Sequence, residues 1–143
     1  MSPLPTFTDT GSGPAIIFLH GIGGNAGNWQ PQIDMLSARY RCIAWNAPGY
    51  ADSPALPEMT FPALADSLAR LMDHLGLEKA VICGLSMGGY GGLTLGLRHP
   101  EMFVSIGSTS GALSYGRGWA SRLRNPEPPR QPTESQRTPE EQA

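Results

Sequence analysis

The residues whose types and spacing most clearly indicate a chemical role are a serine and the two glycines around it. Ser86 lies in the run GLSMG, with Gly84 two positions before it and Gly88 two positions after it. A serine hydroxyl can attack an acyl carbon when a sharp turn between a strand and a helix exposes it. Small residues at these two positions let the flanking backbone segments pass each other. We therefore expect Ser86 to be a catalytic nucleophile on such a turn, shaped by Gly84 and Gly88.

A second glycine-rich segment could supply the rest of an acyl-transfer site. The run HGIGG, residues 20–24, follows a short apolar run near the start of the chain. The oxyanion formed when a serine attacks an acyl carbon is stabilised by hydrogen-bond donors already in place. The amide of Met87 would lie at a helix N-terminus, where free N–H groups favour negative charge. We expect the amide of Ile22 to join it as an oxyanion-hole donor.

Four short apolar runs indicate the strands that must position these residues. They are Ala15–Leu19, Ile43–Trp45, Ala80–Leu85 and Phe103–Ile106. Each is continuous rather than alternating, which is typical of strands buried on both faces of a parallel sheet. Strand-like and helix-like segments alternate along the chain, and this alternation predicts an α/β fold with crossover helices.

Helices are expected between these strands. Residues 61–75 carry apolar side chains at helical spacing, with Thr60 as a cap and Gly76 in the left-handed position at the end. A weaker helix is expected over Trp29–Arg39. The segment after Ser86 contains five glycines, each of which costs a helix roughly 0.5–1 kcal/mol relative to alanine. We still expect a helix there, because glycines on one face allow close approach to a sheet.

Three motifs together resemble those of a known superfamily. HGIGGNAGNW, WNAPGYADS and GLSMGG, in this order, resemble the α/β-hydrolase superfamily, and most of all its esterases, enol-lactonases and carbon–carbon hydrolases. The likeness covers about residues 6–114. It implies a mainly parallel sheet in which the four runs lie in the spatial order second, first, third, fourth. It also implies a serine hydrolase that acts on a small ester, lactone or related carbonyl substrate, with no cofactor and no metal. In such an enzyme, His20 and Gly21 would shape the glycine-rich loop rather than react.

The sequence departs from the family pattern at the exit of the second run. Asn46 stands where the family usually has aspartate, and Ala51 stands where it usually has glycine. We expect Asn46 still to accept a backbone hydrogen bond, so that the substitution modifies the turn without abolishing it. Asp52, in the same turn, is expected to bond to the backbone.

The acid and the histidine of the family's catalytic triad would follow the nucleophile, after a lid insertion. None of the three histidines fits the role of base: His20 belongs to the glycine-rich loop, His74 lies half-solvated near a helix end, and His99 closes the helix after Ser86 at its far end. Residues 117–143 hold five prolines with several arginines and glutamates and little to bury. We expect residues 1–116 to be the N-terminal part of an α/β-hydrolase domain and residues 117–143 to be a disordered tail. We interpret this change in composition as a truncation or a reading-frame shift near Gly118, before the lid and the last strands.

Composition excludes several other classes of function. The formal net charge of −2 gives no attraction to nucleic acid or to an anionic membrane. No apolar stretch approaches the roughly 18 residues of a membrane-spanning helix, and the N-terminus does not resemble a signal peptide. Cys42 and Cys83 lie inside apolar runs, which favours a reducing compartment and a cytoplasmic location.

Two alternatives to a hydrolase of small molecules remain open. The chain could be a catalytically inactive fragment or a partner-dependent half, because the triad acid and base are not found in it. The same serine could also serve an acyltransferase or a cofactor-free haloperoxidase. In a truncated sheet, residues 102–108 would form an uncovered apolar edge, which favours self-association.

Overall fold

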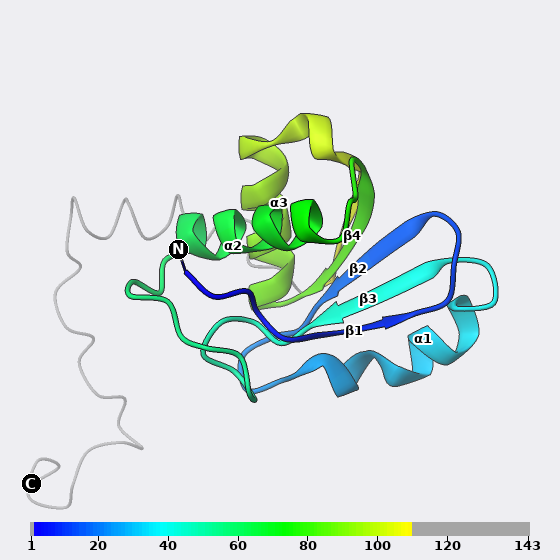
Figure 1. Cartoon of the computed structure of the whole chain (residues 1–143), viewed down its shortest axis with the longest axis horizontal. Coiled ribbons are helices and arrows are strands. Elements are labelled where there is room, and N and C mark those ends of the chain that lie inside the picture. Colours follow the sequence, from blue (N-terminus) through cyan, green and yellow to red (C-terminus); the bar gives the residue numbers. More distant parts are fainter. Residues whose placement is uncertain (1, 110–143) are drawn as a thin grey trace, which may run out of the picture. The chain divides into compact units, whose positions relative to one another are not determined.

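The computed structural model describes residues 2–109, and their strands form one sheet in the order β1-β3-β2-β4-β5 (Figure 1). The strands are β1 Phe7–Thr10, β2 Ala15–Leu19, β3 Arg41–Trp45, β4 Ala80–Leu85 and β5 Phe103–Thr109. Strands β2 to β5 pair in parallel, and β1 pairs with β3 in the antiparallel direction. The expected order of the four apolar runs is confirmed. The expected tail, residues 117–143, lies outside the described residues.

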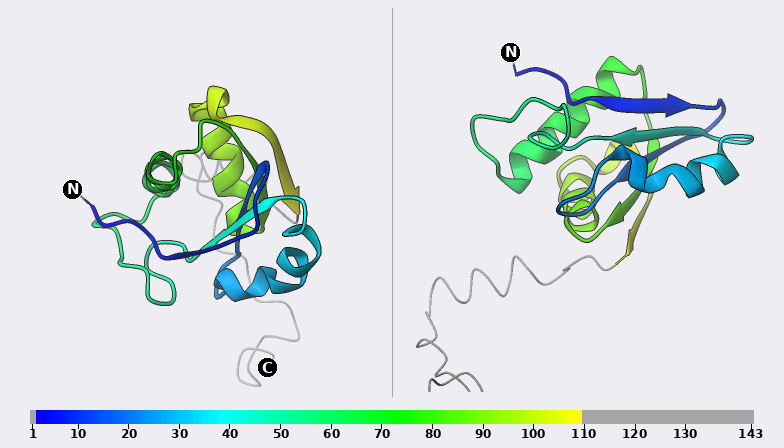
Figure 2. Two further views of the ribbon diagram at one scale, coloured as in Figure 1. Left: turned by 45° about the vertical axis from the view of Figure 1, so that its right-hand side comes forward. Right: turned by 90° about the horizontal axis from the view of Figure 1, so that it is seen from below.

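Helices lie on both faces of the sheet. They are the 3-10 helix η1 Ala26–Trp29, α1 Gln30–Leu36, α2 Phe61–His74, α3 Met87–Arg98 and the 3-10 helix η2 Pro100–Met102. Figure 2 shows η1 and α1 on one side of the sheet and α2 and α3 on the other. Each face has its own apolar cluster. One cluster is centred on Phe18 and Trp29, and the larger one on Ile17, Leu68 and Ile82.

The continuous apolar runs of β2 and β3 are buried to a different extent from that of β4. Ile17, Phe18 and Leu19 are all buried, so both faces of β2 are covered. In β4 the residues facing α3 are buried, whereas Val81 and Cys83 are half-buried and Leu85 is 39% exposed. The seven-residue α1 packs over β2 and β3. Burial on both faces is therefore confirmed for β2 and β3. It is wrong for β4 and for the run Phe103–Ile106 of β5 within the described residues, since Val104 is exposed.

The helix expected over Trp29–Arg39 is shorter than predicted. Trp29 is the last residue of the separate 3-10 helix η1, and α1 runs from Gln30 to Leu36, three residues short of Arg39. The amides of Arg39 and Tyr40 both donate to the Leu36 carbonyl, which turns the chain toward β3. Ile33 is buried and Leu36 half-buried, so the expected inward face is confirmed.

Helix α2 forms where its periodicity predicts. The Thr60 hydroxyl accepts a hydrogen bond from the Ala63 amide at 3.3 Å, which caps the first turn. Gly76 has φ 68°, the left-handed conformation that ends a helix. Of the described residues, none belongs to a helix that combines enough length and enough hydrophobicity to cross a membrane.

Helix α3 forms despite its glycines because two of them, Gly92 and Gly96, face the sheet. A Cβ atom at Gly92 would lie 2.8 Å from Cγ2 of the buried Ile82, and one at Gly96 would overlap Ile106 on β5. Larger residues at these positions would hold the helix away from the strands. Close packing therefore outweighs the low helix propensity of glycine.

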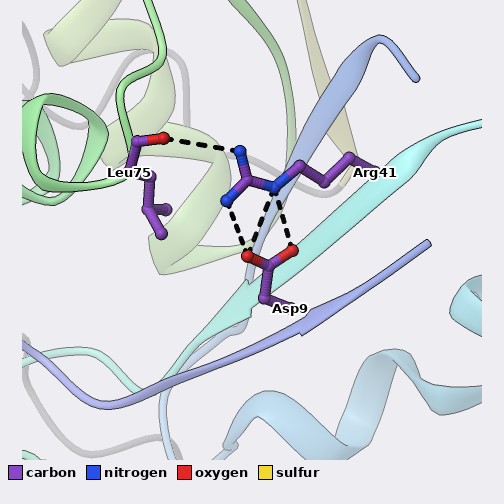
Figure 3. Close-up of polar contacts among 3 residues, drawn as sticks. All are labelled: Asp9, Arg41 and Leu75. Atoms are coloured by element: carbon purple, nitrogen blue, oxygen red, sulfur yellow. Dashed lines mark hydrogen bonds and ion pairs between the residues drawn. The ribbon is translucent and has the colours of Figure 1, made fainter. Parts of the chain in front are cut away.

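One arginine ties three elements together. Nη2 and Nε of Arg41, on β3, donate to the Asp9 carboxylate of β1 at 2.7 Å and 3.0 Å. Nη1 donates to the Leu75 carbonyl at the end of α2, at 3.4 Å (Figure 3). The hydrogen bonds to Asp9 raise the pKa of Arg41. This contact fixes one end of β1 and the C-terminus of α2 to the sheet.

Candidate active site

Ser86 occupies the junction between β4 and α3 in a strained backbone conformation. Strand β4 ends at Leu85, α3 begins at Met87, and Ser86 between them has φ 53° and ψ −111°. Positive φ is rare for residues other than glycine and costs of order 1–3 kcal/mol. Such strain persists only where the surroundings impose it. This is the sharp strand-to-helix turn expected for the GLSMG run.

Two glycines impose this turn. A Cβ atom at Gly84 would lie 2.6 Å from the Gly89 amide nitrogen, and one at Gly88 would lie 2.7 Å from the His20 carbonyl oxygen. Real side chains do not tolerate such distances to backbone atoms. The backbones before and after Ser86 therefore pass each other because Gly84 lacks a side chain, and the start of α3 approaches the end of β2 because Gly88 lacks one.

The glycine-rich loop lies directly against the serine. A Cβ atom at Gly21 would be 3.3 Å from Cβ of Ser86 and 3.4 Å from the Leu85 carbonyl oxygen. The two motifs, far apart in sequence, thus meet at the C-terminal edge of the sheet, since β2 and β4 are adjacent and parallel. The side chain of Ile22 is 79% exposed at this edge. The convergence of the Ile22 and Met87 amides on one oxygen stays a prediction.

His20 is held by both of its ring nitrogens. Its ring is almost fully buried, and Nε2 accepts a hydrogen bond from the Ala47 amide at 3.0 Å. Nδ1 lies 2.8 Å from the Gly21 carbonyl, which can only accept, so Nδ1 carries the proton. The ring is therefore the neutral Nδ1–H tautomer. With its one lone pair engaged by Ala47, His20 has no free nitrogen to act as a base.

Tyr50 is a site residue that the sequence analysis missed. Its ring packs edge-on against His20, with 5.1 Å between the ring centroids. Its hydroxyl donates to Sδ of Met87 at 3.7 Å, next to the serine. A signal was available, because Tyr50 follows β3 closely and the ends of parallel strands meet at one edge of a sheet.

The other two histidines lie away from Ser86. His99 follows the last residue of α3, a helix whose 12 residues span about 18 Å, and its ring lies 3.9 Å from Asp66 and 3.6 Å from Glu101. His74 is exposed at the end of α2 and packs edge-on against Phe7. The expected positions of both are confirmed, except that His74 is more exposed than half-solvated.

The expectation that Asp52 bonds to the backbone is wrong. Its carboxylate accepts hydrogen bonds from the Thr6 hydroxyl at 2.6 Å and from the Asn46 side-chain amide at 3.3 Å, which are side chains rather than backbone. The expectation for Asn46 is confirmed, since its Oδ1 accepts the Ala26 amide at 2.8 Å.

Neither cysteine is placed as a nucleophile. Cys42 is fully buried and Cys83 half-buried, and burial raises the pKa of both thiols. A raised pKa keeps a thiol protonated at neutral pH, whereas the thiolate is the reactive form. Both residues therefore act as small apolar side chains of the sheet.

A narrow crevice lies beneath Met87. It is lined by strand-end residues that include Leu19 and Trp45, and by Leu64 and Leu68 of α2. Its volume corresponds to about one water molecule. The crevice is too small for the acyl group of a substrate.

Comparisons with known proteins agree with this geometry. A family model described as the alpha/beta hydrolase fold matches residues 14–132. The chain is 34% identical over 111 residues to 3-oxoadipate enol-lactonase 1 of Acinetobacter baylyi, covering 76% of this chain and 42% of that protein. It is 40% identical over 99 residues to a 2-hydroxy-6-oxononadienedioate/2-hydroxy-6-oxononatrienedioate hydrolase of Comamonas testosteroni, covering 65% and 35%.

Solved structures show the same correspondence. A thermophilic esterase from Thermogutta terrifontis superimposes with a TM-score of 0.70 at 30% identity, covering 87% of this chain and 49% of the esterase. The chain thus spans about two fifths of the length of the curated enol-lactonase and half that of the esterase. The family match covers most of the chain and includes both the serine turn and the loop that faces it. The chain belongs to the α/β-hydrolase family.

Proposed function

We propose that Ser86 is the nucleophile of a serine hydrolase that acts on a small ester, lactone or related carbonyl compound. The observation that carries the proposal is the positive φ of Ser86 at the end of β4, directly against the Gly21 loop. A serine in this position can attack a carbonyl carbon while backbone amides receive the developing oxyanion. The enol-lactonase and carbon–carbon hydrolase relatives support a carbonyl substrate.

The reaction would proceed through a covalent intermediate. The Ser86 oxygen bonds to the acyl carbon, the leaving group departs with a proton, and water then releases the acyl group as an acid. The Ile22 and Met87 amides would hold the negatively charged oxygen in both steps. A base must take the serine proton, and His20 is excluded from that role by its bond from Ala47.

A second candidate is a partner-dependent half or an inactive fragment. It is favoured by the placement of the histidines, because His74 and His99 both lie at helix ends away from Ser86. A serine without its base retains only the oxyanion site, and losing triad members lowers the rate by several orders of magnitude. The two candidates differ in whether the chain alone can form a covalent adduct.

A fluorophosphonate probe separates them. If the hydrolase proposal holds, the full chain is labelled, and the labelling disappears in Ser86→Ala. The matched control is Ser105→Ala, which removes an exposed serine from β5 and is expected to leave labelling unchanged. Intact-protein mass spectrometry measures the adduct. Absence of an adduct on the folded wild-type chain would favour the second candidate.

We further propose a cytoplasmic location. Both free cysteines are buried or half-buried in the sheet, as reduced thiols of a protein in a reducing compartment usually are.

A further inference from the structure

Both ends of the loop that faces Ser86 are tied to two consecutive residues after β3. At the start of the loop, the Ala47 amide donates to His20 Nε2 at 3.0 Å. At its end, the Ala26 amide donates to Asn46 Oδ1 at 2.8 Å. We propose that Asn46 is a positioning residue for the oxyanion loop, residues 20–26, and that Asp52 fixes the orientation of its amide. The proposal rests on the proposed function of this loop.

Every polar atom of the Asn46 side chain has a defined partner. While Oδ1 accepts from Ala26, Nδ2 donates to the Thr6 hydroxyl at 2.9 Å and to Asp52 Oδ1 at 3.3 Å. The Thr6 hydroxyl in turn donates to the same Asp52 oxygen at 2.6 Å. A flipped amide would set its oxygen against a carboxylate and its nitrogen against the Ala26 N–H. The network therefore permits one orientation only.

The pairing explains why an amide serves here better than the carboxylate usual in the family. An aspartate at position 46 would keep an acceptor oxygen near Ala26, but repulsion from the neighbouring Asp52 carboxylate would displace it from that bond. Asn46 accepts on one side and donates on the other. Exchanging the two residue types, with aspartate at 46 and asparagine at 52, would restore both bonds.

The hydrogen bond between Ala26 and Asn46 matters for catalysis because the loop contacts Ser86, the proposed nucleophile. A Cβ atom at Gly21 would lie only 3.3 Å from Cβ of Ser86, so the loop is packed closely against the serine. Small movements of the loop therefore change the distance from its amides to the reacting oxygen. A displacement of about 1 Å in a catalytic site can cost about 100-fold in rate. Loss of the Asn46 bond would therefore affect the rate of attack more than the binding of a ligand.

The test combines a measurement of the loop with a measurement of the chemistry, on the full chain. Amide hydrogen exchange by NMR reports the Ala26 bond directly. We expect Asn46→Ala and Asn46→Asp to speed exchange at Ala26 about tenfold. The same variants should slow fluorophosphonate labelling of Ser86 about tenfold at saturating probe, with the half-saturating probe concentration within about twofold of wild type. In the double variant Asn46→Asp/Asp52→Asn, both values should return to within about threefold of wild type.

The matched control is Gln30→Ala. It removes a side-chain amide that donates to Asp34 within the same helix, and it should change neither readout. If the wild type is not labelled at all, the hydrolase proposal fails, while Ala26 exchange still tests the tie. Unchanged Ala26 exchange in Asn46→Ala, or no recovery in the double variant, would overturn the inference.

Discussion

Ala51 adopts a backbone conformation that glycine would adopt more readily. Its φ is 47°, in the left-handed region, and the family usually has glycine at this position. The turn after β3 needs this conformation because Gly49 and Ser53 bond across it, with the Gly49 amide donating to the Ser53 carbonyl at 3.2 Å. The alanine therefore carries local strain that the turn imposes.

Ala51→Gly should raise the free energy of unfolding by about 0.5–1 kcal/mol, because the relief of strain exceeds the added freedom of the unfolded chain. Urea denaturation measures the change. Ala55→Gly, at an exposed position of the same segment without a positive φ, should lower stability instead. Equal effects of the two variants would contradict this explanation.

At the scale of single residues, the sequence was informative where one backbone feature decides the outcome. The small residues at Gly84 and Gly88 indicated the turn at Ser86, and the acceptor role of Asn46 followed from its amide. The partners of Asp52 could not be derived, because Thr6 reaches it from a segment 46 positions away. The contact of Tyr50 with His20 likewise depends on how two strand exits meet.

Neighbouring glycines of α3 make opposite contributions. A Cβ atom at Gly91 would meet no atom within 4 Å, whereas one at Gly92 would meet the buried Ile82 at 2.8 Å. Gly91→Ala should stabilise the protein by about 0.5–1 kcal/mol through helix propensity. Gly92→Ala should destabilise it by about 1–3 kcal/mol, since the helix must shift from β4. Thermal denaturation of the two variants compares them. Stabilisation by both would show that α3 does not pack closely on the sheet.

At the scale of elements, long periodic segments were predictable and short ones less so. The apolar spacing of residues 61–75 predicted α2 with its cap, and the continuous runs located β2 to β5. The break between η1 and α1 was not predictable from apolar spacing, because the contact of Trp29 with Phe18 on β2, at 5.0 Å between ring centroids, helps to hold the first turn against the sheet. Within residues 2–109, the partly exposed face of β4 could not be derived from its apolar run, because it depends on which strands α1 packs over.

At the scale of the molecule, β5 lies at the end of the strand order, and within residues 2–109 it pairs only with β4. Its sequence, FVSIGST, carries no charge, and Val104 is 71% exposed. An uncharged edge strand of this length is prone to pair with another chain. Self-association through residues 102–108 accordingly remains our proposal.

Sedimentation velocity over a range of concentrations tests it. We expect the wild-type chain to associate as its concentration rises, and Val104→Lys to shift the midpoint of that association to at least about tenfold higher concentration. Met35→Lys, at an equally exposed methionine on α1, should leave the midpoint unchanged. A wild-type chain that stays monomeric at all concentrations would rule out the proposal.

The four residues of β1 are mostly exposed, yet this strand and the residue before it hold other elements in place. Just before the strand, the Thr6 carbonyl accepts a hydrogen bond from the backbone amide of Asn46 at 2.8 Å. Within the strand, Asp9 forms an ion pair with Arg41. Trimming the chain to Gly11 would leave both Asn46 and Arg41 without these bonds. The start of the chain is therefore a poor place to shorten, and an affinity tag there needs a spacer that leaves Thr6 in place.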